Sequence, residues 1–535
     1  MAVKGKKGYL CLVLHAHLPY VRHAEYPFFL EENWLFEAMT ESYIPLLDVF
    51  TRLLNDRVDF RMTISLSPSL VEMLQDSLLM QRYAGHLARL RDLTDAERRR
   101  VKGDRRFEPV TRMYQARLKR IQHLFDEVYR RNLISALSAM QRAGHLEIIP
   151  TAATHAYLPN LALVPEAVRA QVKIGKQHYR NTFGRLPGGI WLPECGFAQG
   201  FDEHVGEEGF RYFFLEAHGV VRGKPFPPFG VHLPIVCRSG VVAFGRDQKA
   251  SGQVWSSQGG YPGDPLYRDF YRDAGFDIDA DHIRHFLSPY GTKTYTGLKY
   301  YRVTGGVRPK EPYQFERALK RAGQHADHFL AGRVAQIAGL CYQFGIRPVI
   351  TACFDAELLG HWWFEGPNWL EMLLRAADKN RVVKLVSPSE YLGRRQSISH
   401  LQMVHPATSS WGEKGYHEVW LNEKNDDIYR HLLKATRRMV NLAEQFPRAG
   451  GILRRALNQA ARELLLAQQS DWTFMMKTGA HADYARRRFA EHIGRFTRLY
   501  ASIIAEDIRE ETVQEMEEKD RIFPAIDYRV FRGKC

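Results

Sequence analysis

The stretch YLCLVLHAHLP, residues 9–19, decides the fold of this chain. Its apolar run, residues 9–14, is followed at once by His15 and His17, so it is too short and too polar at its end to be a membrane span or a secretion signal. A short, continuous apolar run is typical of a strand that is buried on both faces of a parallel sheet. We therefore expect an α/β fold that begins with this strand.

Further apolar runs alternate with helical patterns along the chain. Apolar residues spaced by three and four predict helices at residues 34–54 and 315–344. Strands separated by helices indicate a parallel sheet or a barrel, and active-site residues of such folds gather at the carboxyl ends of the strands. The other predicted strands lie at residues 60–66, 146–151, 189–193, 212–215 and 348–354.

The composition narrows the class of protein. The 535 residues are 45% hydrophobic and 25% charged, which is ordinary for a globular protein. The six cysteines include no Cys-x-x-Cys pair, which indicates reduced thiols, a cytoplasmic location and no structural zinc site. The formal net charge is +15, but no zinc finger, helix-turn-helix or RNA-binding aromatic motif organises the basic residues. We therefore expect solvated helix faces, no specific nucleic acid or membrane partner, and a monomer.

Four clusters of polar and aromatic residues follow predicted strands. They are HAHLP (15–19), WLPE (191–194), EAHG (216–219) and DAE (355–357), the last of which continues to HWW (361–363). Gathered at one edge of a sheet, these clusters would form a pocket of carboxylates, imidazoles and indoles. Indole faces stack on pyranose rings and the polar groups bind hydroxyls, so this mixture predicts a sugar-binding site.

Glu194 and Asp355 are the candidates for breaking a glycosidic bond. That chemistry needs a proton donor for the leaving oxygen and a second carboxylate, which acts as nucleophile or activates water. A donor at neutral pH needs a raised pKa, which burial beside Trp191 or a neighbouring carboxylate such as Glu357 can supply. Each signal also has a structural interpretation, since a His-x-His pair can be a polar anchor or a metal site and a Trp-Trp pair can belong to the core.

Five segments, in their order along the chain, resemble the conserved regions of glycoside hydrolase family 57. They are HAHLPY (15–20), GIWLPECGF (189–197), FFLEAHG (213–219), CFDAELLGHWWFEGP (353–367) and SSWGEKGYHEVWLN (409–422). The resemblance continues to the tail at residues 521–531. Together with the helical C-terminal part and the run at residues 253–264, this tail is similar to that of the 1,4-α-glucan (glycogen) branching enzymes of the family.

The resemblance implies a (β/α)7 incomplete TIM-like barrel with a helical insertion and a C-terminal all-helical domain. A change to Leu- and Arg-rich helical sequence places the insertion at residues 76–145. The catalytic barrel then occupies residues 1–75 and 146–400, with long active-site loops in its second part. Helical spacing places the C-terminal helical domain at residues 401–535, closed by an extended tail.

The resemblance also implies a retaining mechanism that uses no metal and no other cofactor. Glu194 would be the nucleophile, and Asp355 the general acid/base that protonates the departing oxygen and then deprotonates the 6-hydroxyl of an acceptor chain. The protein would be a glycosyltransferase of carbohydrate metabolism, in glycogen biosynthesis, acting on α-glucans such as amylose and glycogen. The residues expected to bind the glucan are His15, His17, His155, Trp191, Glu216, His218, Arg246, Trp255, His361, Trp362, Trp411, Trp420 and Asp471.

Three alternatives stay open. Branching enzymes of the family carry a tyrosine on a loop after the third conserved region, and the corresponding residues 234–240 include none, which favours an amylase-like α-glucan hydrolase or a weakly active relative. A polysaccharide deacetylase would need a metal-ligand set such as an Asp with a His pair, whereas His15 and His17 supply two ligands only. A basic polyanion-binding protein would require the carboxylate clusters to be incidental.

Overall fold

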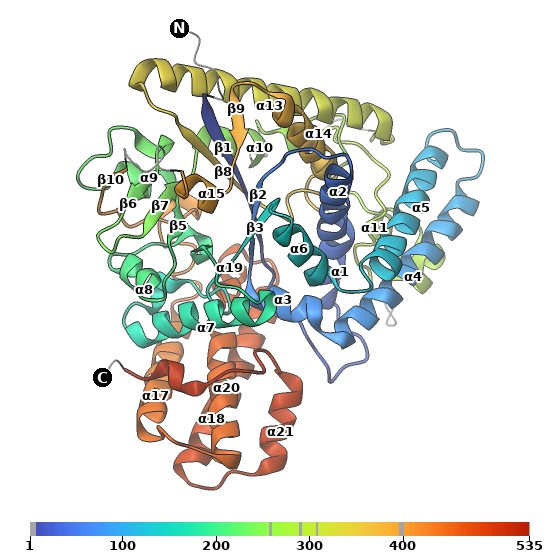
Figure 1. Cartoon of the computed structure of the whole chain (residues 1–535). Coiled ribbons are helices and arrows are strands. Elements are labelled where there is room, and N and C mark those ends of the chain that lie inside the picture. Colours follow the sequence, from blue (N-terminus) through green and yellow to red (C-terminus); the bar gives the residue numbers. More distant parts are fainter. Residues whose placement is uncertain (1–6, 256–258, 288–291, 306–308, 395–400, 534–535) are drawn as a thin grey trace.

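The computed structural model describes residues 7–255, 259–287, 292–305, 309–394 and 401–533 (Figure 1). Its first sheet has the order β3-β2-β1-β8, with β9 paired to the first residues of β1, and every pairing is parallel. All of β1 is buried, as its apolar run predicts. The strands of this sheet are β1 (Gly8–Ala16), β2 (Met62–Leu66), β3 (Leu146–Pro150), β8 (Val349–Asp355) and β9 (Val383–Leu385).

A second sheet has the order β10-β6-β7-β5-β4. It is parallel except for the antiparallel pair β6–β7. The strand predicted at residues 212–215 is present as β5, whereas the one predicted at 189–193 is limited to two residues. The strands are β4 (Gly189–Ile190), β5 (Tyr212–Leu215), β6 (Ile235–Val236), β7 (Val242–Gly245) and β10 (Gln402–Met403).

Two contacts join the sheets. Thr151, directly after β3, forms a parallel bridge with Trp191, directly after β4. The backbone N–H of Asp247, two residues after β7, donates to the carbonyl of Thr351 in β8, with an N···O distance of 2.8 Å. Within the described residues the pairing therefore gives two adjoining sheets and no closed barrel.

The first helices lie beside the first sheet, and α4 and α5 extend away from it as a pair (Figure 1). The helix predicted at residues 34–54 is present, but a π-helical turn, Met39–Tyr43, divides it into α1 and α2. The helices are α1 (Glu32–Ala38), α2 (Ile44–Asn55), α3 (Pro68–Gln75), α4 (Ser77–Arg100), α5 (Glu108–His123) and α6 (Leu133–Arg142).

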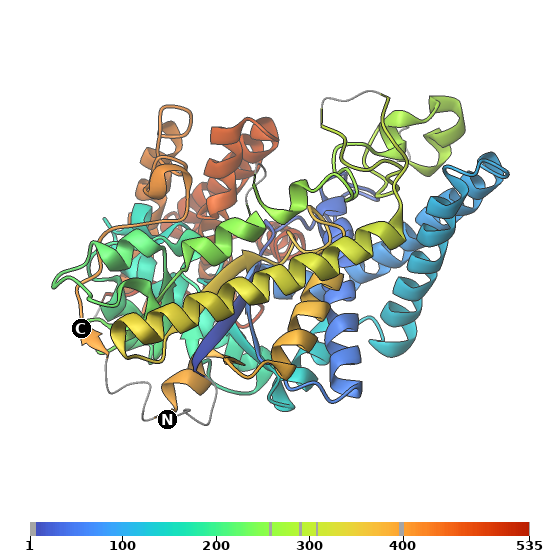
Figure 2. The same cartoon turned by 90° about the horizontal axis from the view of Figure 1, so that it is seen from above.

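The middle of the chain contributes helices of very different length. The predicted helix at residues 315–344 is α13, which runs along one side of the sheets (Figure 2). The helices are α7 (Pro165–Phe183), α8 (Phe201–Glu207), α9 (Ala217–Val221), α10 (Gln248–Trp255), α11 (Ala274–Asp277), α12 (Ala280–Ile283), α13 (Phe315–Phe344), α14 (Gly366–Lys379) and α15 (Pro388–Leu392).

The last part of the chain is helical, and α17, α18, α20 and α21 pack together below the sheets (Figure 1). By contrast, α19 reaches the strand ends, where Gln469 bridges Ala156. The helical content predicted for residues 401–535 is present, and the tail expected to be extended ends in a 3-10 turn, Tyr528–Phe531. The helices are α17 (Asp427–Gln445), α18 (Gly451–Ala467), α19 (Ser470–Thr478), α20 (Ala482–Ile504) and α21 (Glu510–Lys519).

The cysteines of the described residues are unpaired thiols. Five cysteines are free, and Cys535 lies outside the described residues. Four of the five, Cys11, Cys195, Cys237 and Cys353, are buried. None of the helices in the described part of the chain is long and apolar enough to cross a membrane.

Candidate active site

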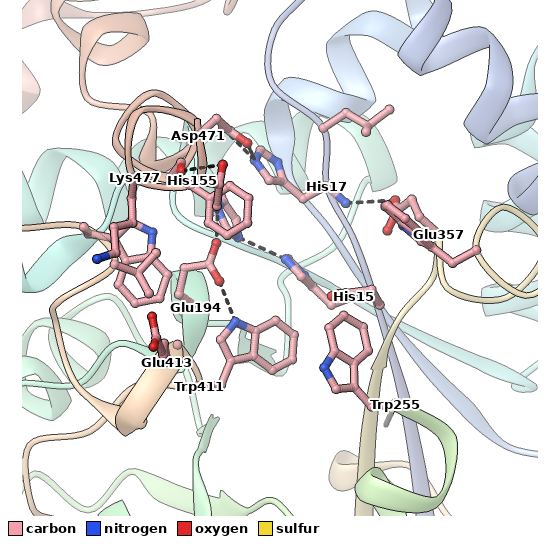
Figure 3. A pocket seen from close by; sticks show the side chains of 18 of the residues that line it. His15, His17, His155, Glu194, Trp255, Glu357, Trp411, Glu413, Asp471 and Lys477 are labelled. Carbon is pink, nitrogen blue, oxygen red and sulfur yellow. Dashed lines mark hydrogen bonds and ion pairs between the residues drawn. The ribbon is translucent and has the colours of Figure 1, made fainter. Parts of the chain in front are cut away.

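A cavity of about 640 Å³ lies where the carboxyl ends of the strands meet the helical C-terminal region (Figure 3). The strands supply His15 and His17 at the end of β1 and Asp355 at the end of β8. Arg246 directly follows β7. The opposite wall comes from α19. The lining residues are His15, His17, Leu18, His155, Glu194, Arg246, Trp255, Asp355, Glu357, Trp362, Trp411, Gly412, Glu413, Val419, Trp420, Asp471, Phe474, Lys477 and Thr478.

A second cavity of about 380 Å³ adjoins the first. The two share Arg246, Trp255 and Trp411, so they form one continuous cleft. Glu216 and His218 line the second cavity, and Arg246 binds Glu216 through a 3.1 Å contact between Nη1 and Oε2. The cleft therefore brings together residues from both sheets.

Glu194 is held by its backbone and by its neighbours. Its φ of 59° lies in the left-handed region, as does that of Cys195 at 48°, and such conformations of non-glycine residues cost about 1–3 kcal/mol each and cluster at functional sites. The indole N–H of Trp411 donates a hydrogen bond to Oε2 of Glu194, and Nδ1 of His155 lies 3.9 Å from Oε1. Burial and the charge of Asp355 raise the pKa of Glu194 to about 8, against the effect of the indole donor.

Two further carboxyl groups of the cavity, those of Asp355 and Glu357, also have raised pKa values. Burial raises the pKa of Asp355 to about 6, although the charges of Arg246 and His17 oppose the change. Burial and the charge of Asp355 raise the pKa of Glu357 to about 8. Glu357 accepts hydrogen bonds from the hydroxyl of Tyr43 and the backbone N–H of His17. The cavity thus carries both protonated and charged carboxyl groups near neutral pH, as general acid catalysis requires.

Three stacked histidines connect the strand ends to α19. Nε2 of His15 lies 3.0 Å from Nε2 of His155, and Nδ1 of His155 lies 3.0 Å from the Ser470 hydroxyl. Nε2 of His17 lies 3.0 Å from a carboxylate oxygen of Asp471. Burial lowers the pKa of His15 and of His155 well below the ordinary range, so both rings are neutral. Neutral imidazoles both donate and accept hydrogen bonds, which suits them to sugar hydroxyls.

Most of the residues predicted to bind a glucan line one of the two cavities, but two do not. Trp191 is fully buried and stacks on His15 at 4.8 Å, so it supports the histidine from behind. His361 is turned to Glu41, with Nδ1 2.6 Å from Oε2. The cavity also includes Leu18 and Glu357, which belong to the clusters predicted to gather there. The residues that the sequence analysis did not assign to a binding site are Gly412, Glu413, Val419, Phe474, Lys477 and Thr478.

Residues 234–240 do not border the cleft. They form β6 and a tight turn, closed by the N–H of Cys237 donating to the carbonyl of Val241. Because β6 and β7 are antiparallel, this turn lies at the amino end of β7, whereas Arg246 lies at its carboxyl end beside the cavity. The absence of a tyrosine from this turn therefore has no bearing on access to the cleft, and the assignment of these residues to a gating loop was wrong.

One set of three possible metal ligands occurs among the described residues, and it lies outside the cleft. Glu463, His492 and Asp520 are buried together between α18, α20 and the segment after α21. Arg495 contacts both carboxylates, at 3.0 Å from Glu463 and 2.8 Å from Asp520. Because Arg488 also lies 3.6 Å from Asp520, the two negative charges already face two positive ones, and the set is an ion-pair network.

Paired half-buried carboxylates and indoles beside the carboxyl ends of parallel strands are the arrangement of a carbohydrate-active enzyme. The chain belongs to glycosyl hydrolase family 57, whose family model matches residues 11–402. Residues 431–531 match a second model, that of the 1,4-alpha-glucan branching enzyme C-terminal region. The family identified from the five segments is thereby confirmed, and so is the resemblance to its branching enzymes.

Individual relatives cover nearly the whole chain. A 1,4-alpha-glucan branching enzyme of Thermococcus kodakarensis is 33% identical over 97% of this chain and 78% of its own length. The crystal structure of a branching enzyme of this family from Pyrococcus horikoshii superimposes with a TM-score of 0.88 at 33% identity, covering 99% of this chain and 97% of that one. A structure described as the α-amylase AmyC of Thermotoga maritima superimposes with a TM-score of 0.92 at 40% identity, covering 99% of this chain and all of that one.

Proposed function

We propose that this protein is a 1,4-α-glucan branching enzyme. It cleaves an α-1,4 bond of a glucan and transfers the freed chain to a 6-hydroxyl. The observation that carries the proposal is the shared cavity: α19 lies within the region matched to the branching-enzyme C-terminal model, and its Asp471, Phe474 and Lys477 line the same cavity as Glu194. The helical region thus contributes directly to the site where the bond is cut.

The proposed reaction is a retaining double displacement. A carboxylate oxygen of Glu194 bonds to the anomeric carbon while Asp355 protonates the departing glycosidic oxygen. Asp355, now charged, takes the proton of the acceptor 6-hydroxyl, whose oxygen displaces Glu194 from the anomeric carbon. The donor-only indole N–H of Trp411 supports this assignment, since it stabilises the charged form of Glu194 that the first step needs.

The order of the two raised pKa values favours the reverse assignment, in which Asp355 is the nucleophile and Glu194 the general acid. At about 8 for Glu194 and about 6 for Asp355, the proton would reside on Glu194. We assign the nucleophile to Glu194, because the indole donor contacts Glu194 alone and bound glucan would change the burial that raises both pKa values. The two assignments differ in the residue that carries the covalent sugar, which is Glu194 in the proposed assignment and Asp355 in the reverse one.

The same observations support the finer parts of the proposal. The two contacts that join the sheets favour an incomplete (β/α)7 barrel, with a helical insertion at residues 76–145 and a C-terminal domain at 401–535. The free thiols favour a cytoplasmic enzyme. We place its reaction in glycogen biosynthesis, with a monomer as the working unit and without a nucleic acid or membrane partner.

Hydrolysis is the second candidate, favoured by the likeness to the structure described as an α-amylase. The two activities share every step up to the covalent intermediate. They differ in whether water or a glucan hydroxyl attacks it, and hence in how completely water is excluded from the cleft.

Product analysis separates the two activities. The protein is incubated with amylose, and new α-1,6 linkages, measured after debranching, are compared with new reducing ends. Many branches with few reducing ends are expected, and Glu194→Gln, the control, should form neither. Reducing ends without branches would overturn the branching proposal and establish a hydrolase.

A further inference from the structure

We propose that an aromatic platform beside the cleft binds a further stretch of the α-glucan chain, outside the catalytic cavity. The platform consists of Phe270, Tyr271, Phe276 and Tyr295, and it adjoins Trp362 at the rim of the cavity. This inference rests on the proposed function. It extends that function by naming a surface that would hold the glucan at a distance from Glu194.

The platform is continuous with the cavity. Trp362 lines the cavity and stacks on Phe270, with ring centroids 4.2 Å apart and planes inclined by 28°. The centroid of Tyr295 lies 6.4 Å from that of Phe270, and Phe276 follows at 4.9 Å from Tyr295. Tyr271 meets Phe270 edge-on at 5.3 Å. A chain that leaves the cavity past Trp362 therefore meets one aromatic ring after another.

Several rings of the platform are exposed to solvent. Tyr271 is 75% exposed and Phe276 is 45% exposed, and Trp362 is 50% exposed. Single exposed aromatic residues are common, whereas a contiguous group beside a cleft is typical of a binding surface.

A buried ion pair beneath the platform fixes its rings in place. Lys299 is 2% exposed, and its ammonium lies 4.8 Å from the centroid of Phe270 and 4.7 Å from that of Tyr295. The same ammonium lies 3.4 Å from Asp273, which accepts further bonds from the backbone N–H groups of Thr296 and Gly275. Phe270 and Tyr295 are therefore held in place before a ligand arrives, which lowers the entropy lost on binding.

The chemistry of the surface favours a neutral sugar polymer. Two charges at its edge pair with each other, since Arg272 binds Asp277 through its Nε at 2.9 Å. Aromatic faces stack on the C–H faces of pyranose rings and need no charge on the ligand. Because the surface continues a cleft for which we propose an α-glucan, the occupant that fits is the same chain.

Binding to long and short glucans tests the platform. Tyr271→Ala and Phe276→Ala are made in Glu194→Gln, so that binding is measured without turnover, by affinity electrophoresis in gels containing amylose. The Kd for amylose is expected to rise about five-fold for each lost ring, the effect of roughly one aromatic contact. The Kd for maltotriose, which is too short to span cavity and platform, should change less.

Tyr342→Ala is the matched control, because Tyr342 is 96% exposed on α13 and belongs to neither cavity nor platform. Its amylose affinity should equal that of the parent. Unchanged amylose affinity in the platform variants would overturn the inference. Because binding is read without turnover, weakened binding would support the platform even if the unsubstituted protein formed no branches, and that result would overturn the proposed function alone.

Discussion

Glu194 shows how one residue can be fixed for chemistry. A left-handed backbone aims the side chain, Trp411 donates to one carboxylate oxygen and His155 faces the other. A strained conformation persists only when its surroundings determine it fully, and here Cys195 beside it is buried in the core. The carboxylate therefore has little freedom to turn away from a bound sugar.

The proposed roles of Glu194 and Asp355 predict where a trapped sugar will be found. Asp355→Asn should lower kcat/KM on amylose by about 10²–10⁴-fold, because asparagine can neither protonate the departing oxygen nor deprotonate the acceptor hydroxyl. A glucosyl fluoride needs no acid to leave, so this variant should accumulate a covalent glucosyl–enzyme. Mass spectrometry of peptides is expected to locate the sugar on Glu194.

Two results would contradict these roles. A sugar attached to any residue other than Glu194 would reverse or remove the assignment of the nucleophile. The same label in the Glu194→Gln, Asp355→Asn double variant would show that the adduct forms without the proposed nucleophile, so this variant serves as the control.

At the scale of elements, the start of α3 is coupled to the cavity through Ser67. Its hydroxyl accepts from the backbone N–H of Leu70 as the N-cap of α3, and lies 2.8 Å from Nδ1 of His17. His17 in turn contacts Asp471 on α19. Ser67, which directly follows β2, thus caps the start of α3 and contacts the His17 ring in the cavity.

Ser67→Ala is expected to reduce both stability and activity. Loss of the cap should lower the free energy of unfolding by about 1 kcal/mol, and loss of the contact to His17 should lower kcat/KM. The matched control is Asn132→Ala, which removes the N-cap of α6, where Asn132 accepts from Ser135, away from the cavity. Urea unfolding should show similar losses in both variants, and an equal loss of kcat/KM in the control would refute the coupling.

The strand ends were predictable from the sequence because their signal is local. The apolar runs and the polar residues that directly follow them placed His15, Glu194 and Asp355 at one edge, where the structure has them. Of the wall formed by α19, the family resemblance predicted Asp471 alone. Phe474 and Lys477 were not predictable, because they reach the cavity only through packing across more than one hundred residues of sequence. The turn at residues 234–240 was misplaced, because sequence does not show that β6 runs antiparallel to β7.

For the whole molecule, a buried ion-pair network holds together the helical region that completes the cavity. Glu463 and Asp520 face Arg495 and His492, and burial raises the pKa of both carboxyl groups despite these partners. Removing one partner of such a network leaves a charge buried without compensation, which costs far more than an exposed ion pair contributes.

Arg495→Met is therefore expected to lower the free energy of unfolding by about 3–5 kcal/mol near neutral pH. A raised pKa in the folded state means that folding takes up protons, so this contribution favours folding at low pH and is lost as the pH rises through the folded-state pKa. Without Arg495 these pKa values rise further. The deficit should consequently be largest at mildly alkaline pH and should shrink on acidification.

Urea unfolding across this pH range measures the effect. The control is Arg486→Met on the same helix, because Arg486 forms an exposed pair with Asp427 at 3.0 Å, worth at most about 1 kcal/mol. A deficit in Arg495→Met that did not change with pH would contradict the electrostatic explanation.

The position of α19 late in the chain has a consequence for the order of events during synthesis. A ribosome releases Glu194 and Asp355 well before it reaches residues 470–478, and domains fold from the amino end as they emerge. A nascent chain that has completed both sheets therefore holds the proposed nucleophile and acid but lacks the wall from α19. We expect the cleft to be complete only after residues 470–478 have been made, so that a chain interrupted before them does not cut glucan.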